Sequence, residues 1–283
     1  MNSFILQKQE EVIALAQFDI KDAVLKKCIL KEGETVITVP DGVTTIGKDA
    51  LCGLQSVIAV TLPESLKVIN DGAFYGCSSL TSVTLPGSVE RLGSCAFAQC
   101  SALNTIYLDN KLTEIGNSAF WGCTSLESID IPAGVTKIGY NLFGSCLSLI
   151  SVSLPDTVTE LDERAFKECT SLACITLPDS LIKIGNMAFL NCHNLKSVNI
   201  PDRLESIGEK AFFMCESLHE LEIPDGIASV GGDAFSDCVS VTVRSTISGK
   251  PLYKAVTATD GSSAYNFILR NIWDKGGFDF TAQ

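Results

Sequence analysis

The sequence has little of what most catalytic and metal sites require. Only two histidines and two tryptophans occur among its 283 residues. Basic residues are also scarce, with 21 Lys and Arg against 33 Asp and Glu, so the formal net charge is -12. Such a chain repels phosphate backbones, which speaks against nucleic-acid binding. No apolar run approaches the ~18 residues that a membrane-spanning helix needs, so we expect no membrane insertion.

What the sequence does have is proline at a fixed interval. Eight prolines follow one another at gaps of 23 residues, except for one gap of 46 whose midpoint is Asp109. This spacing divides residues 40–246 into nine units of 23 residues. We call them coils 1 to 9 and number each from its proline as position 1. The coils begin at residues 40, 63, 86, 109, 132, 155, 178, 201 and 224.

Small and apolar residues recur at fixed positions of the coils. Position 12 is Phe in eight coils, position 11 is Ala in eight, and position 15 is Cys in eight. A 23-residue unit is too short to bury its own apolar face, whereas stacked units bury one continuous core. We therefore expect a ladder of phenylalanine rings and a column of buried, unpaired cysteine thiols.

Position 8 carries a further constraint. It is Gly in seven coils, and Asn70 and Asp162 fill the other two. Gly, Asn and Asp are the residues that best tolerate a positive φ angle. The pattern therefore predicts a left-handed corner at position 8.

Positions 21 and 23 are aliphatic in eight coils and alternate with polar residues at positions 20 and 22. This period of two is typical of a half-buried strand. Stacked strands would form a parallel sheet along one face, advancing ~4.8 Å per coil. Its outward side chains, at positions 20 and 22, are the expected binding surface.

The segment LTSVTLPGSVERLGSCAFAQC, from Leu80 to Cys100, resembles the BspA-like class of bacterial leucine-rich repeats. The resemblance covers about residues 35–246. It implies an α/β repeat solenoid, right-handed, with nine 23-residue coils and a parallel β-sheet along one face. Relatives in this class are often cell-surface proteins that bind host or neighbouring-cell proteins, and they share no catalytic motif.

The flanks of the repeat are expected to be caps. Three parts follow: residues 1–39 as an N-terminal helix and capping hairpin, residues 40–246 as the solenoid, and residues 247–283 as a C-terminal cap with a helix. The first helix would lie within residues 1–17 and the last over residues 262–275. The hairpin would span residues 23–39, with its turn around Gly33.

No residue constellation points to catalysis. His193 and His219 lie near Glu216 and could form a metal or acid–base group, but solvated residues at the coil edge are the simpler interpretation. No glycine-rich phosphate loop or zinc motif occurs. We therefore expect no enzyme, no cofactor and no metal site.

Coil 4 departs most from the repeat on the expected binding face. Asp109 replaces its proline, and in the strand just before it Tyr107 replaces the usual small polar residue. An amphipathic ring on a floor of small polar residues is suited to anchor a partner. The candidate ligand-binding residues are Thr84, Tyr107, Glu127, Asp130 and Ser153. The plainer interpretation is drift in one coil, and the aromatic side chains at position 13, around Trp121, are the next candidate surface.

Two functions remain open at this point. The first is a non-catalytic scaffold that binds a protein or glycan in adhesion or host and cell-surface interaction. The coils hold 24 acidic and 12 basic residues, which favours a basic partner. The resemblance implies a cell-surface or secreted location, although residues 1–17 do not read as a signal peptide. The alternative is a cytosolic structural or adaptor repeat protein with no surface role.

Overall fold

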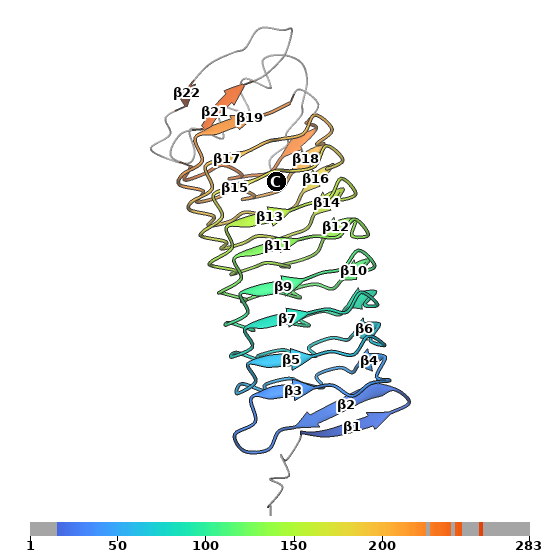
Figure 1. Ribbon diagram of the computed structural model, residues 1–283. Coiled ribbons are helices and arrows are strands. Elements are labelled where there is room, and N and C mark those ends of the chain that lie inside the picture. The colour runs from blue at the N-terminus through green and yellow to red at the C-terminus, as the bar shows by residue number, and fades with distance from the viewer. Residues whose placement is uncertain (1–15, 225–226, 239–240, 245–254, 257–283) are drawn as a thin grey trace, which may run out of the picture.

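The computed structural model describes residues 16–224, 227–238, 241–244 and 255–256. These residues form an elongated solenoid in which successive coils stack on one another and place short strands on two sides (Figure 1). The expectation of an α/β fold is wrong: the described residues contain strands and turns but no helix. The helix expected over residues 262–275, and nearly all of the one expected over residues 1–17, lie outside the described residues.

The segment at positions 10 to 15 of each coil explains why the described residues contain no helix. Backbone N–H groups at positions 11, 13 and 15 donate to carbonyls three residues earlier, as from Ala73 to Asn70, Tyr75 to Gly72 and Cys77 to Phe74. Positions 10 and 14 have positive φ in all nine coils. Left-handed residues at these two points interrupt the dihedral angles that a helix needs, so the segment becomes a series of tight turns.

The expected parallel sheet is present, and we call it sheet 1. Its strands cover positions 20 to 22 and pair in register from coil to coil, as Val83 does with Ile106. The strands are β3 (Val36–Thr38), β5 (Ala59–Thr61), β7 (Ser82–Thr84), β9 (Thr105–Tyr107), β11 (Ser128–Asp130), β13 (Ser151–Ser153), β15 (Cys174–Ile175), β17 (Ser197–Val198), β19 (Glu220–Glu222) and β21 (Val241–Arg244).

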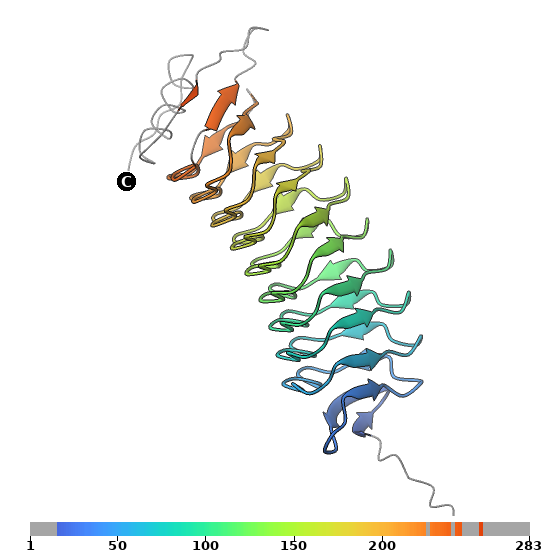
Figure 2. The same ribbon diagram turned by 60° about the vertical axis from the view of Figure 1, so that its left-hand side comes forward.

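A second parallel sheet, sheet 2, was not predicted. Its two-residue strands fall at positions 6 and 7, where one aliphatic residue per coil points inward and leaves no alternating pattern to detect. The strands are β4 (Thr45–Ile46), β6 (Val68–Ile69), β8 (Arg91–Leu92), β10 (Glu114–Ile115), β12 (Lys137–Ile138), β14 (Glu160–Leu161), β16 (Lys183–Ile184), β18 (Ser206–Ile207) and β20 (Ser229–Val230). Figure 2 shows the two rows of strands running along the solenoid.

The N-terminal hairpin differs from the one expected. Its strands are β1 (Gln17–Lys21) and β2 (Val24–Ile29), which pair antiparallel, and β2 then starts sheet 2 by pairing with β4. The turn at Gly33 leads instead from sheet 2 to sheet 1, because β3 pairs with β5. Ile37 pairs with Val60, so β3 carries the register of position 21 into the N-terminal flank.

The last coil is one residue shorter than the repeat. Strand β21 pairs with β19 so that Leu221 lies opposite Val243, an offset of 22 rather than 23 residues. Arg244 therefore pairs with Glu222, at position 22 of the preceding coil, rather than with its position 21. Strand β21 also pairs antiparallel with β22 (Ala255–Val256), so an antiparallel strand pair stands at each end of the described stack.

Both sheets are interrupted near coils 4 and 5. Sheet 1 divides between β9 and β11 and again between β13 and β15, and sheet 2 divides between β10 and β12. Three successive coil interfaces therefore each lack one of their two strand ladders. The turns at position 12 remain joined there, as Phe120 N–H still donates to Leu142 C=O over 3.1 Å.

The core confirms the expected ladders. Phenylalanine rings from Phe74 to Phe235 are buried and stack coil on coil, with ring centroids 4.9 to 6.0 Å apart and planes within 13° of parallel. The cysteine column, Cys77 to Cys238, is buried beside them. Each column thiol donates to the position 12 carbonyl of the preceding coil, as Cys123 Sγ does to Phe97 O over 3.2 Å.

The left-handed corner predicted at position 8 is wrong. Glycines there have no positive φ; the left-handed residues are at positions 10 and 14, and many of them are not glycine. Position 8 favours glycine because backbones of successive coils approach closely there, although Asn70 and Asp162 also occupy it. A Cβ on Gly208 would lie 2.5 Å from the carbonyl carbon of Gly185, and one on Gly185 would lie 2.6 Å from that of Asp162.

This correction makes a prediction at coil 8. Gly208→Ala and Gly208→Asn should both lower the free energy of unfolding by about 2 kcal/mol or more, because any Cβ meets backbone that cannot move aside. Lys210→Gly, at the left-handed position 10, should change it by less than about 1 kcal/mol, since relief of strain offsets added chain entropy. Urea unfolding of the three variants checks this. A mild effect of Gly208→Asn alone would restore the left-handed corner.

The cysteine column makes a second prediction. Burial raises the pKa of Cys123 and of Cys192 to about 12, so almost no reactive thiolate forms in the native state at about pH 8. Mass spectrometry after brief labelling of native protein should find Cys52 and Cys174, which are exposed, modified before any column thiol. Rapid native labelling of Cys123, or a mass lower by two protons per disulfide, would contradict the free and buried column.

Candidate functional site

The outward face of sheet 1 is a floor of small polar side chains. Position 21 points inward, as Ile106 and Ile129 are each less than 5% exposed. Positions 20 and 22 point outward, and Ser82, Ser128 and Ser151 there are exposed. The alternation follows from the strand geometry, which sends successive side chains to opposite faces.

All five predicted ligand-binding residues lie on or beside this face, but in two groups. Thr84 and Tyr107 are register partners on β7 and β9. Asp130 and Ser153 are register partners on β11 and β13, and Glu127 is exposed just before β11. The interruption between β9 and β11 separates the groups.

Tyr107 is the side chain that stands out. It is 65% exposed, more than any other large apolar side chain in the described part of the chain. The backbone next to it is stretched: Glu127 N lies 3.5 Å from Asn104 O, whereas the equivalent bond one coil later, from Ile150 N to Glu127 O, is 2.8 Å. The exposed ring therefore stands beside the loosened contact between coils 3 and 4.

One contact between coils, a hydrogen bond from a hydroxyl at position 3, varies along the stack. At position 3, Ser88 donates to the carbonyl of Leu66 in the preceding coil over 2.6 Å, and Thr157 does the same to Val135 over 2.8 Å. Coils 4 and 5 have Lys111 and Gly134 at this position, neither of which carries a hydroxyl. This loss does not follow the interruptions, because coil 8 has Arg203 at position 3 with both ladders intact, and coil 6 has Thr157 where sheet 1 divides between β13 and β15.

The other candidate groups do not converge. His193 Nδ1 lies 3.5 Å from Glu216 Oε1, while His219 Nδ1 lies 2.7 Å from the carbonyl of its neighbour Ser217. No group of three potential metal ligands forms among the described residues. At position 13, Tyr75 is 38% exposed and Trp121 is half-buried, so that column is a partly packed surface.

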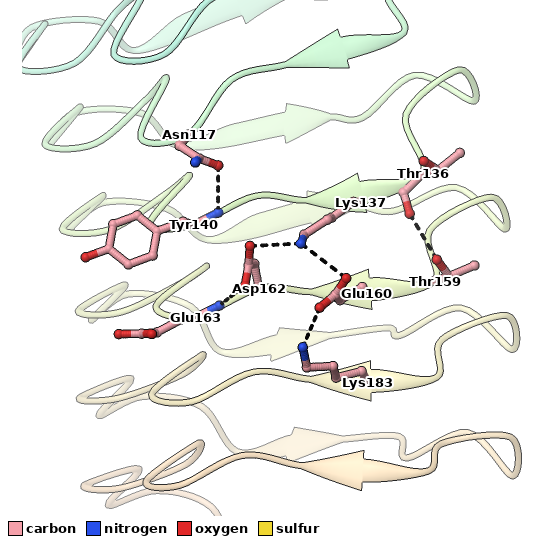
Figure 3. A network of polar contacts seen from close by, with 9 residues as sticks. All are labelled: Asn117, Thr136, Lys137, Tyr140, Thr159, Glu160, Asp162, Glu163 and Lys183. Atoms are coloured by element: carbon pink, nitrogen blue, oxygen red, sulfur yellow. Dashed lines mark hydrogen bonds and ion pairs between the residues drawn. The ribbon is translucent and has the colours of Figure 1, made fainter.

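The outward face of sheet 2 carries a cluster of paired charges (Figure 3). Lys137 Nζ lies 3.2 Å from Glu160 Oε2 and 2.9 Å from Asp162 Oδ2, and Lys183 Nζ lies 2.6 Å from Glu160 Oε1. Lys137, Glu160 and Lys183 occupy position 6 of coils 5, 6 and 7, so the parallel register places opposite charges directly beside one another.

A side-chain amide joins coils 4 and 5 next to this cluster. Asn117 Oδ1 accepts from the backbone N–H of Tyr140 over 3.2 Å, where the ladder of sheet 2 is interrupted (Figure 3). Asp71 and Asn186 make the same kind of link to the following coil, to Ser94 N and Glu209 N. The polar groups on this side thus join neighbouring coils, so their role is structural.

Both carboxylates in the cluster have pKa values below their usual range. The hydrogen bond from Lys183 lowers the pKa of Glu160, with Lys137 adding to it. For Asp162, partial burial opposes the change, but the hydrogen bond from Lys137 and the Glu163 N–H prevail and lower its pKa. A lowered native pKa means stability that is present above the unfolded pKa and lost as pH falls through the native one.

The cluster therefore predicts pH-dependent stability. Glu160→Gln should lower the free energy of unfolding by about 1 kcal/mol near neutral pH, because Lys183 loses its partner and Lys137 keeps only Asp162, in a solvent-screened setting. The difference from wild type should shrink below about pH 4, where the carboxylate protonates, and in high salt. Glu114→Gln is the matched control: Glu114 holds the same position of coil 4 and makes no ion pair among the described residues. Equal effects of both variants in urea titrations would argue against the cluster.

Known proteins with the same architecture match the chain closely. The family model described as "BspA type Leucine rich repeat region (6 copies)" matches residues 19–150 and 136–251. A "leucine rich cell surface protein" from Faecalibacterium prausnitzii A2-165 is 29% identical, with a TM-score of 0.64 over 81% of this chain and 74% of its own. A leucine-rich repeat protein from Bacteroides ovatus is 25% identical, with a TM-score of 0.64 over 83% of this chain and 71% of its own.

A third solved structure supports the same assignment. The leucine-rich repeat protein of T. pallidum is 30% identical, with a TM-score of 0.55 over 72% of this chain and 88% of its own. No curated protein matches the chain. The described residues contain no helix that is long and apolar enough to cross a membrane. From the repeat, the fold and the family match together, the chain belongs to the BspA-type leucine-rich repeat family.

Proposed function

We propose that the protein is a non-catalytic binding scaffold that presents the outward face of sheet 1 to a protein or glycan partner at a cell surface. The observation that carries the proposal is the face itself. It is a continuous exposed floor of small polar side chains, and one large amphipathic ring, Tyr107, rises from it at 65% exposure. An aromatic anchor on a floor of small polar side chains is a common form of binding surface.

The family supports a surface role. The F. prausnitzii relative, at 29% identity, is described as a cell-surface protein. Scaffolds of this kind are typically non-catalytic, and the polar groups of sheet 2 are used to join coils. The alternative, a cytosolic structural or adaptor role, predicts that the full-length protein stays with the cytosol on cell fractionation. Recovery with the envelope or the medium favours the proposal.

The binding face makes a prediction about separable effects. The double variant Tyr107→Ala, Asp130→Ala should change the free energy of unfolding by less than about 0.5 kcal/mol, because both side chains are exposed. Its affinity for any partner recovered from a panel of purified cell-surface proteins and glycans should fall at least about tenfold.

Tyr75→Ala is the control, since it removes an exposed aromatic ring from the turn at position 13. Unchanged binding by the double variant, with binding lost in Tyr75→Ala, would move the site to the position 13 column around Trp121.

A further inference from the structure

Two open clefts run along the edge of sheet 1 where each coil turns at its proline. One, of about 470 Å³, is lined from Val152 to Asn199, and the other, of about 410 Å³, from Asp179 to Arg203. Both are lined by Asp179 and Asn199, so they form one groove across coils 5 to 8. We call it the proline-edge groove. It begins next to Ser153, at the end of the face described above.

Each coil contributes the same two groups to this groove. Position 22 brings an exposed polar side chain, and position 2 brings an exposed carboxylate just after the proline. The polar groups are Ser153, Thr176 and Asn199, and the carboxylates are Asp156, Asp179 and Asp202. Parallel stacking repeats each group at ~4.8 Å from coil 6 to coil 8, while sheet 1 is interrupted between coils 5 and 6. The groove is therefore a regular track rather than a closed pocket.

At the floor of the proline-edge groove, a side chain occupies backbone hydrogen-bonding groups. Asn199 Oδ1 accepts from Leu177 N over 2.7 Å, and Asn199 Nδ2 donates to Leu177 O over 2.8 Å. This amide takes both backbone groups of Leu177, just where β15 and β17 end. A partner in the groove would therefore find side chains rather than an open strand edge, and recognition must come from the carboxylates and hydroxyls.

The charge of the groove selects its partner. Three carboxylates face a single cation, Arg203, and no ion pair among the described residues neutralises any of the three. The same position 2 is uncharged in coils 3 to 5, with Gly87, Asn110 and Ala133, so the carboxylates of coils 6 to 8 form a row separate from the acidic residues at position 2 of coils 1 and 2. A row of like charges in a cleft concentrates ligands of opposite sign.

We propose that the proline-edge groove binds an extended peptide segment rich in Arg and Lys from a partner protein, an inference that rests on the proposed scaffold function and names its partner class. An extended chain lies along a straight track, and long basic side chains reach carboxylates spaced at ~4.8 Å. Arginine in particular pairs with carboxylates through two parallel hydrogen bonds. No aromatic side chain lines the groove, which leaves it without a platform for an uncharged sugar ring.

The test uses the full chain and two synthetic peptides of equal length, one alternating Arg and Ser and one alternating Gln and Ser. Fluorescence anisotropy should show binding of the Arg peptide that weakens steeply with salt, and much weaker binding of the Gln peptide. The variant Asp156→Asn, Asp179→Asn, Asp202→Asn should weaken Arg-peptide binding at least about tenfold. Absence of binding by wild type overturns the proposal.

Matched variants separate the groove from net charge. Asp41→Asn, Glu64→Gln, Glu90→Gln removes three exposed carboxylates from coils 1 to 3 and should change the affinity less than about twofold. An equal loss in this control overturns the proposal, because binding would then follow total charge. Thr176→Lys places a cation in the groove with every carboxylate intact and should also weaken binding. It keeps the test valid if the triple variant fails to fold.

The outcome is distinguishable from failure of the scaffold function. If wild type recovers a surface partner whose binding the groove variants leave unchanged, the groove proposal fails and the scaffold proposal stands. If no panel member binds wild type, the scaffold proposal itself fails. Binding of a neutral glycan that the groove variants abolish would assign the groove to sugars and overturn the peptide.

Discussion

Backbone hydrogen bonds join neighbouring coils around most of their circumference, and the spacing that these bonds set governs the other features of the molecule. It places the phenylalanine centroids 4.9 to 6.0 Å apart, close enough to stack. It lets each column thiol reach a carbonyl of the coil before it. It also brings the backbones of successive coils close together at position 8, where seven of nine coils have glycine. A constant unit length follows, because an inserted residue would break every column at once.

The columns that point into the core could be predicted from the sequence, because burial imposes the same residue type on each coil. Phe166 and Cys169 were assigned correctly for this reason. The turns could not be predicted in the same way. Residues as different as Arg164 and Met187 adopt the left-handed φ at positions 10 and 14. These positions are exposed or half-buried, so no single residue type is required there. The preference for glycine at position 8 has two possible causes, a positive φ angle and a close approach of backbones, and here the second applies.

The features of the candidate site also divide into those that the sequence predicts and those that it does not. Exposure of Tyr107 followed from the alternation along its strand, which is a local rule. The interruption beside it lies in the contact between coils 3 and 4, which the residues of one strand do not reveal. The proline-edge groove was also missed, because its hydroxyls and carboxylates come from opposite sides of a proline and converge only when coils stack. Side chains outside the core are constrained by neighbours 23 residues away. A single sequence reveals these contacts only after the register of the coils is known.

The interruptions around coils 4 and 5 have a mechanical consequence. The bonds between coils run along the long axis of the solenoid, so a pull on its two ends loads the coil interfaces in series (Figure 1). In a series, extension concentrates at the softest elements, and three adjacent interfaces here have lost one of their two ladders. The retained ladder and the backbone bonds of the turns around position 12 still hold each of these interfaces together. A pull on the ends is therefore expected to extend the solenoid at these three interfaces first, and Tyr107 and Asp130 stand on either side of one of them.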